Sequence, residues 1–256
     1  MHSTKFTKYH GAGNDFIIIE DYSCHFLPLL QKKISTLCHR NLGIGADGLI
    51  LLQPSSIADV KMLIFNSDGS EADFCGNGLR CVIHYLNQLN SKSSLLKVET
   101  LAGVCAGKTS NTLIKASLPK AKILKKEIAL KTNHIGYLVD TGVIHLVIFI
   151  PNIEDANLMK QAKDYRLKYN ANVNFAKIEK SLIKIRTFEK GVENETFACG
   201  SGGGAVSLIA SKLFNSKNLI PISFRSEEIA NYEIDRPIKI WMEGPAKVIF
   251  EGKYNF

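Results

Sequence analysis

One short motif occurs twice in the chain, and this repeat constrains the fold more than any other feature. Residues 71–78 read EADFCGNG and residues 195–202 read ETFACGSG, so both fit the pattern E-x-x-x-C-G-x-G. The two copies lie about 120 residues apart, which is a typical length for one domain. A repeat at this distance predicts two similar halves that arose by duplication, each carrying one copy of the motif.

Each copy of the motif is followed by a stretch with helical periodicity. The apolar residues that recur at helical spacing are Leu79, Val82, Ile83 and Leu86 after the first copy, and Val206, Ile209, Ala210 and Leu213 after the second. Cys75 and Cys199 are therefore each predicted to lie at the start of a buried helix. The unpaired N–H groups and partial positive charge of a helix start lower the pKa of a thiol, which increases the fraction of reactive thiolate.

Short β-rich segments account for most of the remaining apolar sequence. The predicted strands are 15–21, 48–53, 60–66, 95–100 and 112–118 in the first half, and 134–140, 144–150, 173–179, 182–189, 221–226 and 238–244 in the second. So many strands with so few helices favour an α+β fold over alternating β-α-β units. Residues 117–122 are the best boundary, which gives one domain of residues 1–118 plus a C-terminal strand at 245–256, and a second domain of residues 119–244.

Composition restricts the compartment and the partners. The chain has 256 residues and a formal net charge of +8, but its lysines are scattered and no nucleic-acid motif is present. A solvated basic surface is the expected result, with no nucleic acid and no membrane as partner. The chain shows no secretory leader and no apolar stretch long enough to span a bilayer, so a cytoplasmic location is expected. None of the six cysteines has zinc-finger or C-x-x-C spacing, so we expect no structural metal.

Two thiols at two helix ends suggest a particular chemistry if the halves face each other across one cleft. The backbone N–H groups of Gly76, Asn77, Gly200 and Ser201 could then bind one carboxylate. One thiolate could remove the proton from the adjacent carbon while the other thiol returns a proton to the opposite face. The pattern therefore indicates stereoinversion by two bases, in which the helix ends stabilise the developing negative charge.

Five segments in the same order resemble the diaminopimelate epimerase family. They are YHGAGNDFIIIE (9–20), HRNLGIGADGLILL (39–52), FNSDGSEADFCGNGLRC (65–81), ANVNFAKI (171–178) and IRTFEKGVENETFACGSGGGA (185–205). The family interconverts LL- and meso-diaminopimelate without a cofactor, on the bacterial route to lysine and peptidoglycan. The resemblance implies a homodimer of two-domain subunits, each domain a mainly antiparallel sheet wrapped around a central helix, with the site in the cleft between the domains.

The resemblance also implies roles for individual residues. Cys75 and Cys199 match the acid/base pair, and the substrate-binding residues of the family match Asn14, Asn66, Asn172 and Glu189. His145 and Glu189 match residues thought to tune the thiols, although a histidine in an apolar strand also fits a hydrogen-bonded core residue. Asn172 has a neighbour of the same type in NVNF that could be mistaken for it. Four cysteines remain, which we interpret as structural: Cys24, Cys38, Cys81 and Cys105.

The chain departs from the family pattern where the far end of the substrate is recognised. Val143 replaces an asparagine, and Lys190 replaces an arginine that is expected to bind the distal carboxylate. Lysine keeps the charge but loses the planar two-pronged geometry of arginine. The segment between Glu189 and Cys199 is also one residue longer than is common. We therefore expect diaminopimelate epimerisation with relaxed substrate selectivity.

Three other functions fit part of the pattern. A racemase of another amino acid, similar to proline racemase, would also use two cysteines, but such enzymes lack the HGAGNDF segment found here. A thiol redox sensor would join Cys75 and Cys199 in a disulfide on oxidation. A non-catalytic protein could bind carboxylate ligands at the two helix ends. Entry of solvent deuterium at the α-carbon of an amino acid would distinguish an epimerase from the last two.

Overall fold

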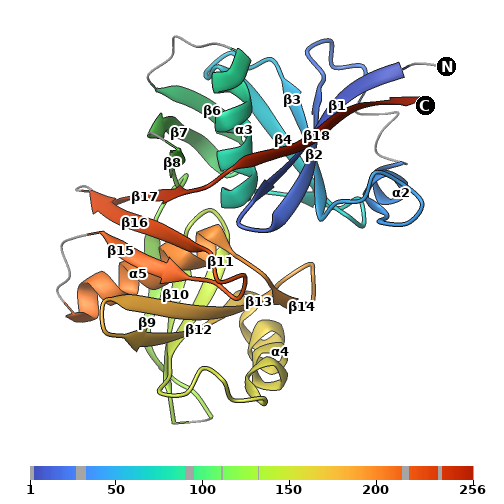
Figure 1. Ribbon diagram of the computed structural model, residues 1–256. Coiled ribbons are helices and arrows are strands. Elements are labelled where there is room, and N and C mark those ends of the chain that lie inside the picture. Colours follow the sequence, from blue (N-terminus) through green and yellow to red (C-terminus); the bar gives the residue numbers. More distant parts are fainter. Residues whose placement is uncertain are drawn as a thin grey trace. The chain divides into compact units, whose positions relative to one another are not determined.

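The computed structural model describes residues 3–26, 33–89, 95–110, 112–131, 133–214, 219–235 and 238–255 (Figure 1). The chain divides into two compact units. The first consists of residues 1–116 and 245–256, and the second of residues 117–244. The division lies two residues before the boundary expected at residue 118.

The first unit is built on a mainly antiparallel sheet. Its strands are β1 (Ser3–Gly11), β2 (Asn14–Glu20), β3 (Gly48–Gln53), β4 (Val60–Asn66), β5 (Glu71–Ala72), β6 (Leu96–Thr100), β7 (Gly103–Ser110), β8 (Leu113–Ser117) and β18 (Lys247–Asn255), and its helices are α2 (Ile34–Cys38) and α3 (Gly76–Leu89). The strands pair in the order β18-β1-β2-β3-β4-β6-β7-β8, and β5 pairs with the end of β4. The pairs β2–β3 and β4–β6 are parallel, and the others are antiparallel.

The second unit has its own sheet with the same plan. Its strands are β9 (Lys122–Ala129), β10 (Ile135–Asp140), β11 (Ile144–Phe149), β12 (Asn172–Glu179), β13 (Leu182–Glu189), β14 (Asn194–Thr196), β15 (Ile220–Ser223), β16 (Ile229–Asp235) and β17 (Lys239–Gly244), and its helices are α4 (Leu158–Tyr169) and α5 (Gly200–Phe214). The strands pair in the order β9-β10-β11-β12-β13-β15-β16-β17, with β14 on β13. The parallel pairs are β11–β12 and β13–β15.

The two sheets are equivalent strand by strand. In each unit the chain forms an antiparallel pair (β1–β2 or β10–β11), and the next strand pairs with it in parallel (β3 or β12). That strand begins a second antiparallel pair, which is followed by a very short strand and then by the motif helix. A second parallel step leads from there into a three-stranded meander. The predicted α+β class and the pseudo-symmetry of the two halves are therefore confirmed.

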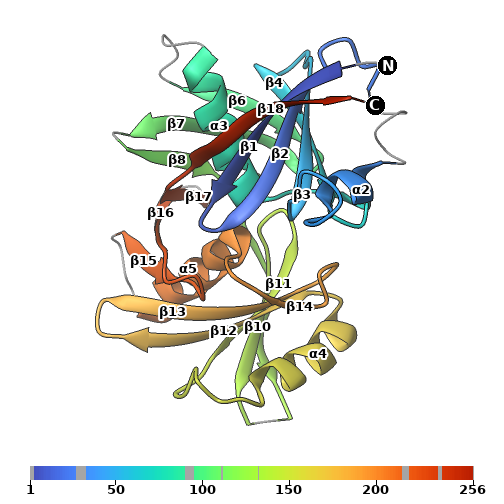
Figure 2. The ribbon, with the colours of Figure 1, turned by 45° about the vertical axis from the view of Figure 1, so that its right-hand side comes forward.

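The motif helix of each unit packs against strands from across its sheet. Helix α3 contacts β1, β2, β4, β6 and β7, and helix α5 contacts β10, β11, β12, β15, β16 and β17. Figure 2 shows both helices among the strands of their own units. The apolar residues predicted for the buried face of α3 are almost fully buried, since Leu79, Val82 and Ile83 are each 0% exposed. Among the helices in the described ranges, none has the length and apolar composition that a membrane-spanning helix requires.

Glycine lets α5 approach its sheet more closely than other residues would permit. A Cβ on Gly203 would collide with the ring and hydroxyl of Tyr232, and a Cβ on Gly202 would collide with the amide oxygen of Asn174. The Tyr232 hydroxyl donates a hydrogen bond of 2.8 Å to the carbonyl of Gly200 in the first turn of the helix. The glycine run after Cys199 thus fixes how deeply the start of α5 lies in the unit.

Several elements differ from the prediction. Helix α4 and the strands β1, β7, β9 and β16 were not predicted. Strand β9 contains Lys122, Lys125 and Lys126, and most of its side chains are exposed, so it lacks the apolar alternation that marks a half-buried strand. The strand predicted at 221–226 ends at Ser223, because the backbone turns there, with a hydrogen bond of 3.0 Å from the N–H of Glu227 to the carbonyl of Phe224.

The close approach of α5 predicts the effect of one added methyl group. Replacing Gly203→Ala should lower the free energy of unfolding by about 1–3 kcal/mol, because the tyrosine must move and lose its hydrogen bond to the helix. Trp241, the single tryptophan of the chain, lies in β17 of the same unit and reports its unfolding in urea. Lys212→Ala, an exposed change on the same helix, is the control. Equal midpoints for the two variants would contradict this account of the glycine run.

Candidate active site

Cys75 lies immediately before the first residue of α3. The backbone N–H of Gly78 points at the sulfur with an N···Sγ distance of 3.5 Å, as expected for a side chain that caps a helix start. On another side, the sulfur is 3.7 Å from Oδ1 of Asn14, and the thiol is the donor in this contact. The sulfur is partly exposed to solvent, unlike Gly76 and Asn77, which are buried.

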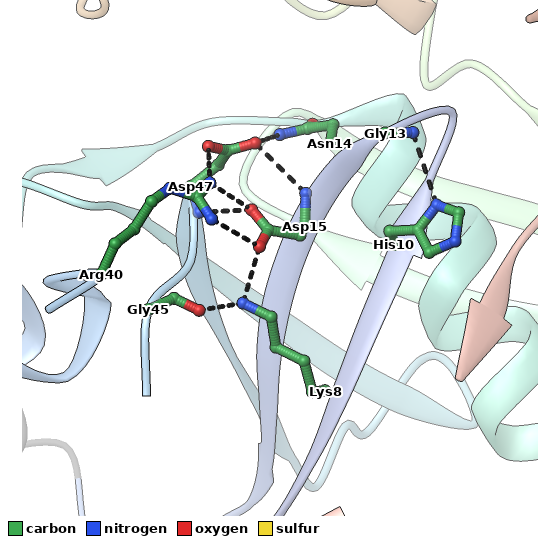
Figure 3. Close-up of polar contacts among 8 residues, drawn as sticks. All are labelled: Lys8, His10, Gly13, Asn14, Asp15, Arg40, Gly45 and Asp47. Carbon is green, nitrogen blue, oxygen red and sulfur yellow. Dashed lines mark hydrogen bonds and ion pairs between the residues drawn. The ribbon is translucent and has the colours of Figure 1, made fainter. Parts of the chain in front are cut away.

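Asn14, at the start of β2, is held by hydrogen bonds on both sides of its amide group. Its Nδ2 donates to Oδ2 of Asp47 at 2.8 Å (Figure 3). Its Oδ1 accepts a hydrogen bond of 3.3 Å from Nδ2 of Asn77 in the first turn of α3. The structure thus brings together three residues predicted for the site, Cys75, Asn14 and Asn77.

Asp47 is in turn part of an ion cluster behind the site (Figure 3). Arg40 donates to Oδ1 of Asp47 at 2.8 Å and to both carboxylate oxygens of Asp15, and the buried Lys8 lies 2.7 Å from Asp15. Burial opposes ionisation of Asp15, but the hydrogen bonds and charges of Arg40 and Lys8 outweigh it and lower its pKa to about 2. This carboxylate therefore stays charged well below neutral pH, and it anchors the loop of Asp47 against β2.

Asn66, the last residue of β4, lies in a tight turn. Its side chain donates to Oγ of Ser70 at 2.9 Å, and its backbone N–H donates to the carbonyl of the same residue at 2.8 Å. Within the described part of the chain, the hydrogen bonds that join Cys75 to Asn14 do not include Asn66.

Cys199 has the equivalent place in the second unit, directly before the first residue of α5. Its sulfur is 3.5 Å from Oγ of Ser201, and the side chain is buried, with 4% of its surface exposed. The hydroxyl of Ser201 lies 3.1 Å from Nε2 of His145, which is on the neighbouring strand β11. One hydroxyl group therefore connects the histidine to the thiol.

The other ring nitrogen of His145 is held by Asn174. The two atoms, Nδ1 of His145 and Nδ2 of Asn174, are 3.0 Å apart. The same Nδ2 is 3.5 Å from the carbonyl of Leu146, and Oδ1 of Asn174 accepts from the hydroxyl of Thr187 at 3.0 Å. This pattern makes Asn174 the donor to Nδ1, so the proton of the ring is on Nε2 and is donated to Ser201.

His145 is neutral in this setting. Complete burial lowers its pKa from 6.5 to about 3, and Asp140 opposes this shift only in part. The structure therefore places His145 both in the core, with 0% of its surface exposed, and one hydroxyl away from Cys199. The neutral ring affects the thiol through hydrogen bonding rather than through a positive charge.

The remaining predicted residues of the second unit lie near the start of β12 and the end of β13. Oδ1 of Asn172 accepts a hydrogen bond of 2.8 Å from the backbone N–H of Lys190, whose side chain is exposed. Glu189 is the last residue of β13 and is partly buried. Val143 is in the tight turn between β10 and β11, where the N–H of Thr141 donates to its carbonyl at 3.1 Å.

Sequence reasoning missed two of the residues that hold the site together, Asn174 and Asp47. From the sequence, Asn174 is only a residue that could be mistaken for Asn172. Residues two apart in a strand share one face of the sheet, so Asn174 lies on the same face as Asn172. That alternation was the available signal. Asp47 gave no comparable signal, because its partner Asn14 lies 33 residues earlier and reaches it only through the pairing of β2 with β3.

None of the other four cysteines lies at the start of α3 or α5. Cys38, Cys81 and Cys105 are buried, as expected of structural residues, whereas Cys24 is exposed in a turn with a positive φ of 57°. Burial raises the pKa of the Cys38 thiol to about 12 and raises that of Cys81 as well, so both remain protonated.

Solved structures of other proteins share this fold. A phenazine biosynthesis protein of the PhzF family from Bacillus anthracis superimposes with a TM-score of 0.78 at 16% identity, covering 100% of both chains. A probable proline racemase from Agrobacterium radiobacter superimposes with a TM-score of 0.80 at 12% identity, covering 99% of this chain and 93% of that one. The chain thus has the two-domain α+β fold of the racemase and PhzF class of proteins.

Sequence comparison narrows this class to one family. The family model of diaminopimelate epimerase matches residues 6–113. A diaminopimelate epimerase from Archaeoglobus fulgidus is 39% identical over 268 residues, which cover 96% of this chain and 95% of the relative. One from Campylobacter lari is 38% identical over 253 residues, covering 98% and 99%. The chain belongs to the diaminopimelate epimerase family, as its sequence motifs predicted.

The neutral state of His145 predicts how acid affects stability. In the unfolded chain this residue takes up a proton below pH 6.5, but in the folded chain only near pH 3. The free energy of unfolding should therefore fall as the pH is lowered from 6.5 towards 3, with a slope from this residue of about 1.4 kcal/mol per pH unit.

Urea unfolding followed by Trp241 fluorescence measures this slope. The variant His145→Gln should have a smaller slope between pH 6 and 4 than the parent protein, and His134→Gln in the same unit is the control. An unchanged slope in His145→Gln would show that burial does not keep the ring neutral.

Proposed function

We propose that this protein converts LL-diaminopimelate to meso-diaminopimelate, with Cys75 and Cys199 as the two acid/base groups. One observation carries the proposal. Each of two equivalent sheets places a cysteine at the start of its central helix, in a chain that is 36–39% identical to diaminopimelate epimerases over nearly its whole length. Membership of this family makes the protein an isomerase.

In the proposed reaction the two units act as two domains that present their thiols to opposite faces of one α-carbon. The thiolate of one cysteine removes the α-proton, and the thiol of the other donates a proton from the opposite side, which inverts the centre. Backbone N–H groups at Gly76, Asn77, Gly200 and Ser201 bind the α-carboxylate. They stabilise the negative charge that this group gains when the carbon is deprotonated.

The surrounding polar residues bind and orient the substrate. Asn14, Asn66, Asn172 and Glu189 are proposed to contact its amino and carboxylate groups, and His145 with Glu189 to tune the thiols. The hydrogen bond from Asn14 to Asp47 and the link from His145 through Ser201 to Cys199 support these roles, because they fix side chains beside each sulfur.

The proposal includes the wider setting of the reaction. The two thiols supply both the acid and the base, so no pyridoxal phosphate or metal takes part. The protein is proposed to be a cytoplasmic homodimer that serves lysine and peptidoglycan synthesis, with a free amino acid as its substrate and neither nucleic acid nor a membrane as partner.

Incorporation of solvent deuterium tests the reaction directly. Purified protein incubated with LL-diaminopimelate in D₂O, without added cofactor, should form meso-diaminopimelate with deuterium at the inverted carbon. A redox sensor or a non-catalytic carboxylate binder would leave the α-hydrogen in place. Deuterium in proline but not in diaminopimelate would favour a proline-racemase-like enzyme instead.

Removal of either thiol should abolish inversion. The variants Cys75→Ala and Cys199→Ala each lack one of the two groups that a complete inversion needs, so we expect turnover to fall by at least about a thousandfold. Cys105→Ala, which changes a buried cysteine away from both helix starts, is the control and should remain active. Activity close to the parent level in either of the first two variants would rule out the two-thiol mechanism.

The changes at Val143 and Lys190 predict relaxed selectivity. A charge-assisted hydrogen bond contributes about 1.5–3 kcal/mol, and Lys190 can replace only part of a bidentate arginine contact. We expect measurable inversion of shorter acidic or polar amino acids alongside diaminopimelate. The double variant Val143→Asn/Lys190→Arg should increase the preference for diaminopimelate by at least about tenfold in kcat/KM.

Competition between diaminopimelate and single shorter amino acids measures this preference. Lys168→Arg, which makes the same exchange on the exposed face of α4, is the matched control. If no other amino acid is inverted and the double variant leaves the preference unchanged, the distal contacts do not govern selectivity.

A further inference from the structure

We infer that the resting protein carries a proton on Cys75 and the negative charge on Cys199, and that Asp47 is a positioning residue for this arrangement. The inference rests on the proposed function, in which one sulfur must be a thiolate and the other a thiol. The two helix starts are alike and cannot decide between the sulfurs. The hydrogen-bond chains that end at the two sulfurs differ, because one presents an acceptor and the other a donor.

On the Cys75 side, the buried Arg80 fixes the orientation of the Asn77 side chain. Its Nη2 donates to Oδ1 of Asn77 at 2.9 Å, and its Nε donates to the carbonyl of Pro245 at 3.3 Å. The amide of Asn77 is thereby oriented, because only its oxygen can accept from a guanidinium. Its Nδ2 consequently faces Asn14 and requires an acceptor there.

Asp47 fixes the orientation of Asn14 itself, through a hydrogen bond with the Nδ2 end of its amide (Figure 3). A carboxylate can only accept hydrogen bonds, and the bond of 2.8 Å from Asn14 therefore has to come from Nδ2. Both constraints place Oδ1 of Asn14 towards Cys75, 3.7 Å from its sulfur. An amide oxygen accepts a hydrogen bond from a thiol but gives no stabilisation to a thiolate.

The ion cluster at the far end of this chain adds no net charge that would favour a thiolate at Cys75. The ion cluster contains two cations, Lys8 and Arg40, and two carboxylates, Asp15 and Asp47, so its formal charges cancel. The positive charge of the buried Arg80 acts in the other direction, but the hydrogen bonds that orient this chain go from its guanidinium to Asn77 and Pro245. The N–H of Gly78 donates to the sulfur at 3.5 Å, which a thiol can accept while it donates its own proton to Asn14.

On the Cys199 side, the hydrogen bonds that link Asn174, His145 and Ser201 run towards the sulfur. Asn174 donates to Nδ1 of His145, and the neutral ring donates from Nε2 to Oγ of Ser201. With its oxygen accepting from His145, the hydroxyl of Ser201 has its own proton to donate, and the sulfur of Cys199 lies 3.5 Å away. A donated O–H stabilises a thiolate more than a thiol.

The assignment runs against what exposure alone would predict. Cys199 is 4% exposed, whereas Cys75 is partly open to solvent, and burial by itself favours the neutral form of a thiol. Alkylation by a small neutral reagent such as iodoacetamide reports the thiolate fraction at each sulfur. Mass spectrometry resolves the two sites, and no turnover is needed.

The variant Asp47→Asn should reverse the orientation of Asn14. The oxygen of the new amide stays on the charged Arg40, so its NH₂ group faces Asn14 and replaces the acceptor of the Asp15 N–H. The oxygen of Asn14 can then no longer serve both Asn77 and residue 47, and where it turns to residue 47 its NH₂ group faces Cys75. We expect the alkylation rate of Cys75 at neutral pH to rise about five- to tenfold. The double variant Asn14→Asp/Asp47→Asn again presents an acceptor to the sulfur and adds a negative charge beside it, so it should return this rate to the parent level or below.

The variant Ser201→Ala should have the opposite effect in the other unit. Loss of the donated hydroxyl should lower the alkylation rate of Cys199 about five- to tenfold, although the smaller side chain opens space beside the sulfur. Asp164→Asn, which removes one carboxylate from the exposed surface of α4, is the control for the charge change and should alter neither rate.

Cys38 distinguishes reorientation from loosening of the structure. It is buried among apolar side chains close to the ion cluster, so local opening by Asp47→Asn would make it reactive as well. Faster alkylation of Cys75 with Cys38 still protected supports the inference, whereas unchanged rates at Cys75 overturn it. If Cys38 becomes reactive in Asp47→Asn, the variant Ser201→Ala provides the test instead. An unchanged or faster alkylation rate at Cys199 in that variant overturns the inference. If these rate changes occur but the parent protein has no epimerase activity, the proposed function is refuted instead.

Discussion

The packing of each motif helix inside its own sheet determines where the two thiols lie. In the second unit this packing depends on glycine, because any side chain at Gly203 would collide with Tyr232, whose hydroxyl binds the first turn of α5. In the first unit a Cβ on Gly78 would lie 3.1 Å from Ile50, so α3 also packs closely on its strands, although less tightly than α5. A helix start that is fixed in this way holds the adjacent cysteine against the sheet, within reach of polar residues on the neighbouring strands.

Equivalent topology supports different chemistry in the two units. Asn14 at the start of β2 contacts Cys75, and the corresponding strand β11 supplies His145, which is linked to Cys199 through Ser201. Duplication thus accounts for the scaffold and for the two cysteines, whereas the residues around each sulfur diverged. This explains why a repeat in the sequence predicts two thiols but says nothing about which of them is charged.

The sequence predicted the scaffold well, because each unit is built from local patterns. Strands such as 48–53 and 60–66 match the observed bounds, since both are nearly continuous apolar runs that end at turn residues. Helix α4 was missed because its burial is limited to residues such as Leu158, Ala162 and Tyr165 among many charged ones. The site was predicted only where the motif itself carried it. Asp47 and Asn174 act through partners far away in sequence, and such pairings follow from strand register rather than from any local pattern.

An enzyme that works in both directions restricts how strong any bias between its two thiols can be. Each turnover by two bases leaves the proton on the sulfur that was previously charged, so the next cycle starts from the opposite state. A strong preference for one state would trap the protein after a single turnover. The contacts that set the bias here are long ones, 3.7 Å from Cys75 to Asn14 and 3.5 Å from Cys199 to Ser201. Sulfur is a weak hydrogen-bond donor and acceptor, so these contacts favour one resting state and still allow the proton to change places in every cycle.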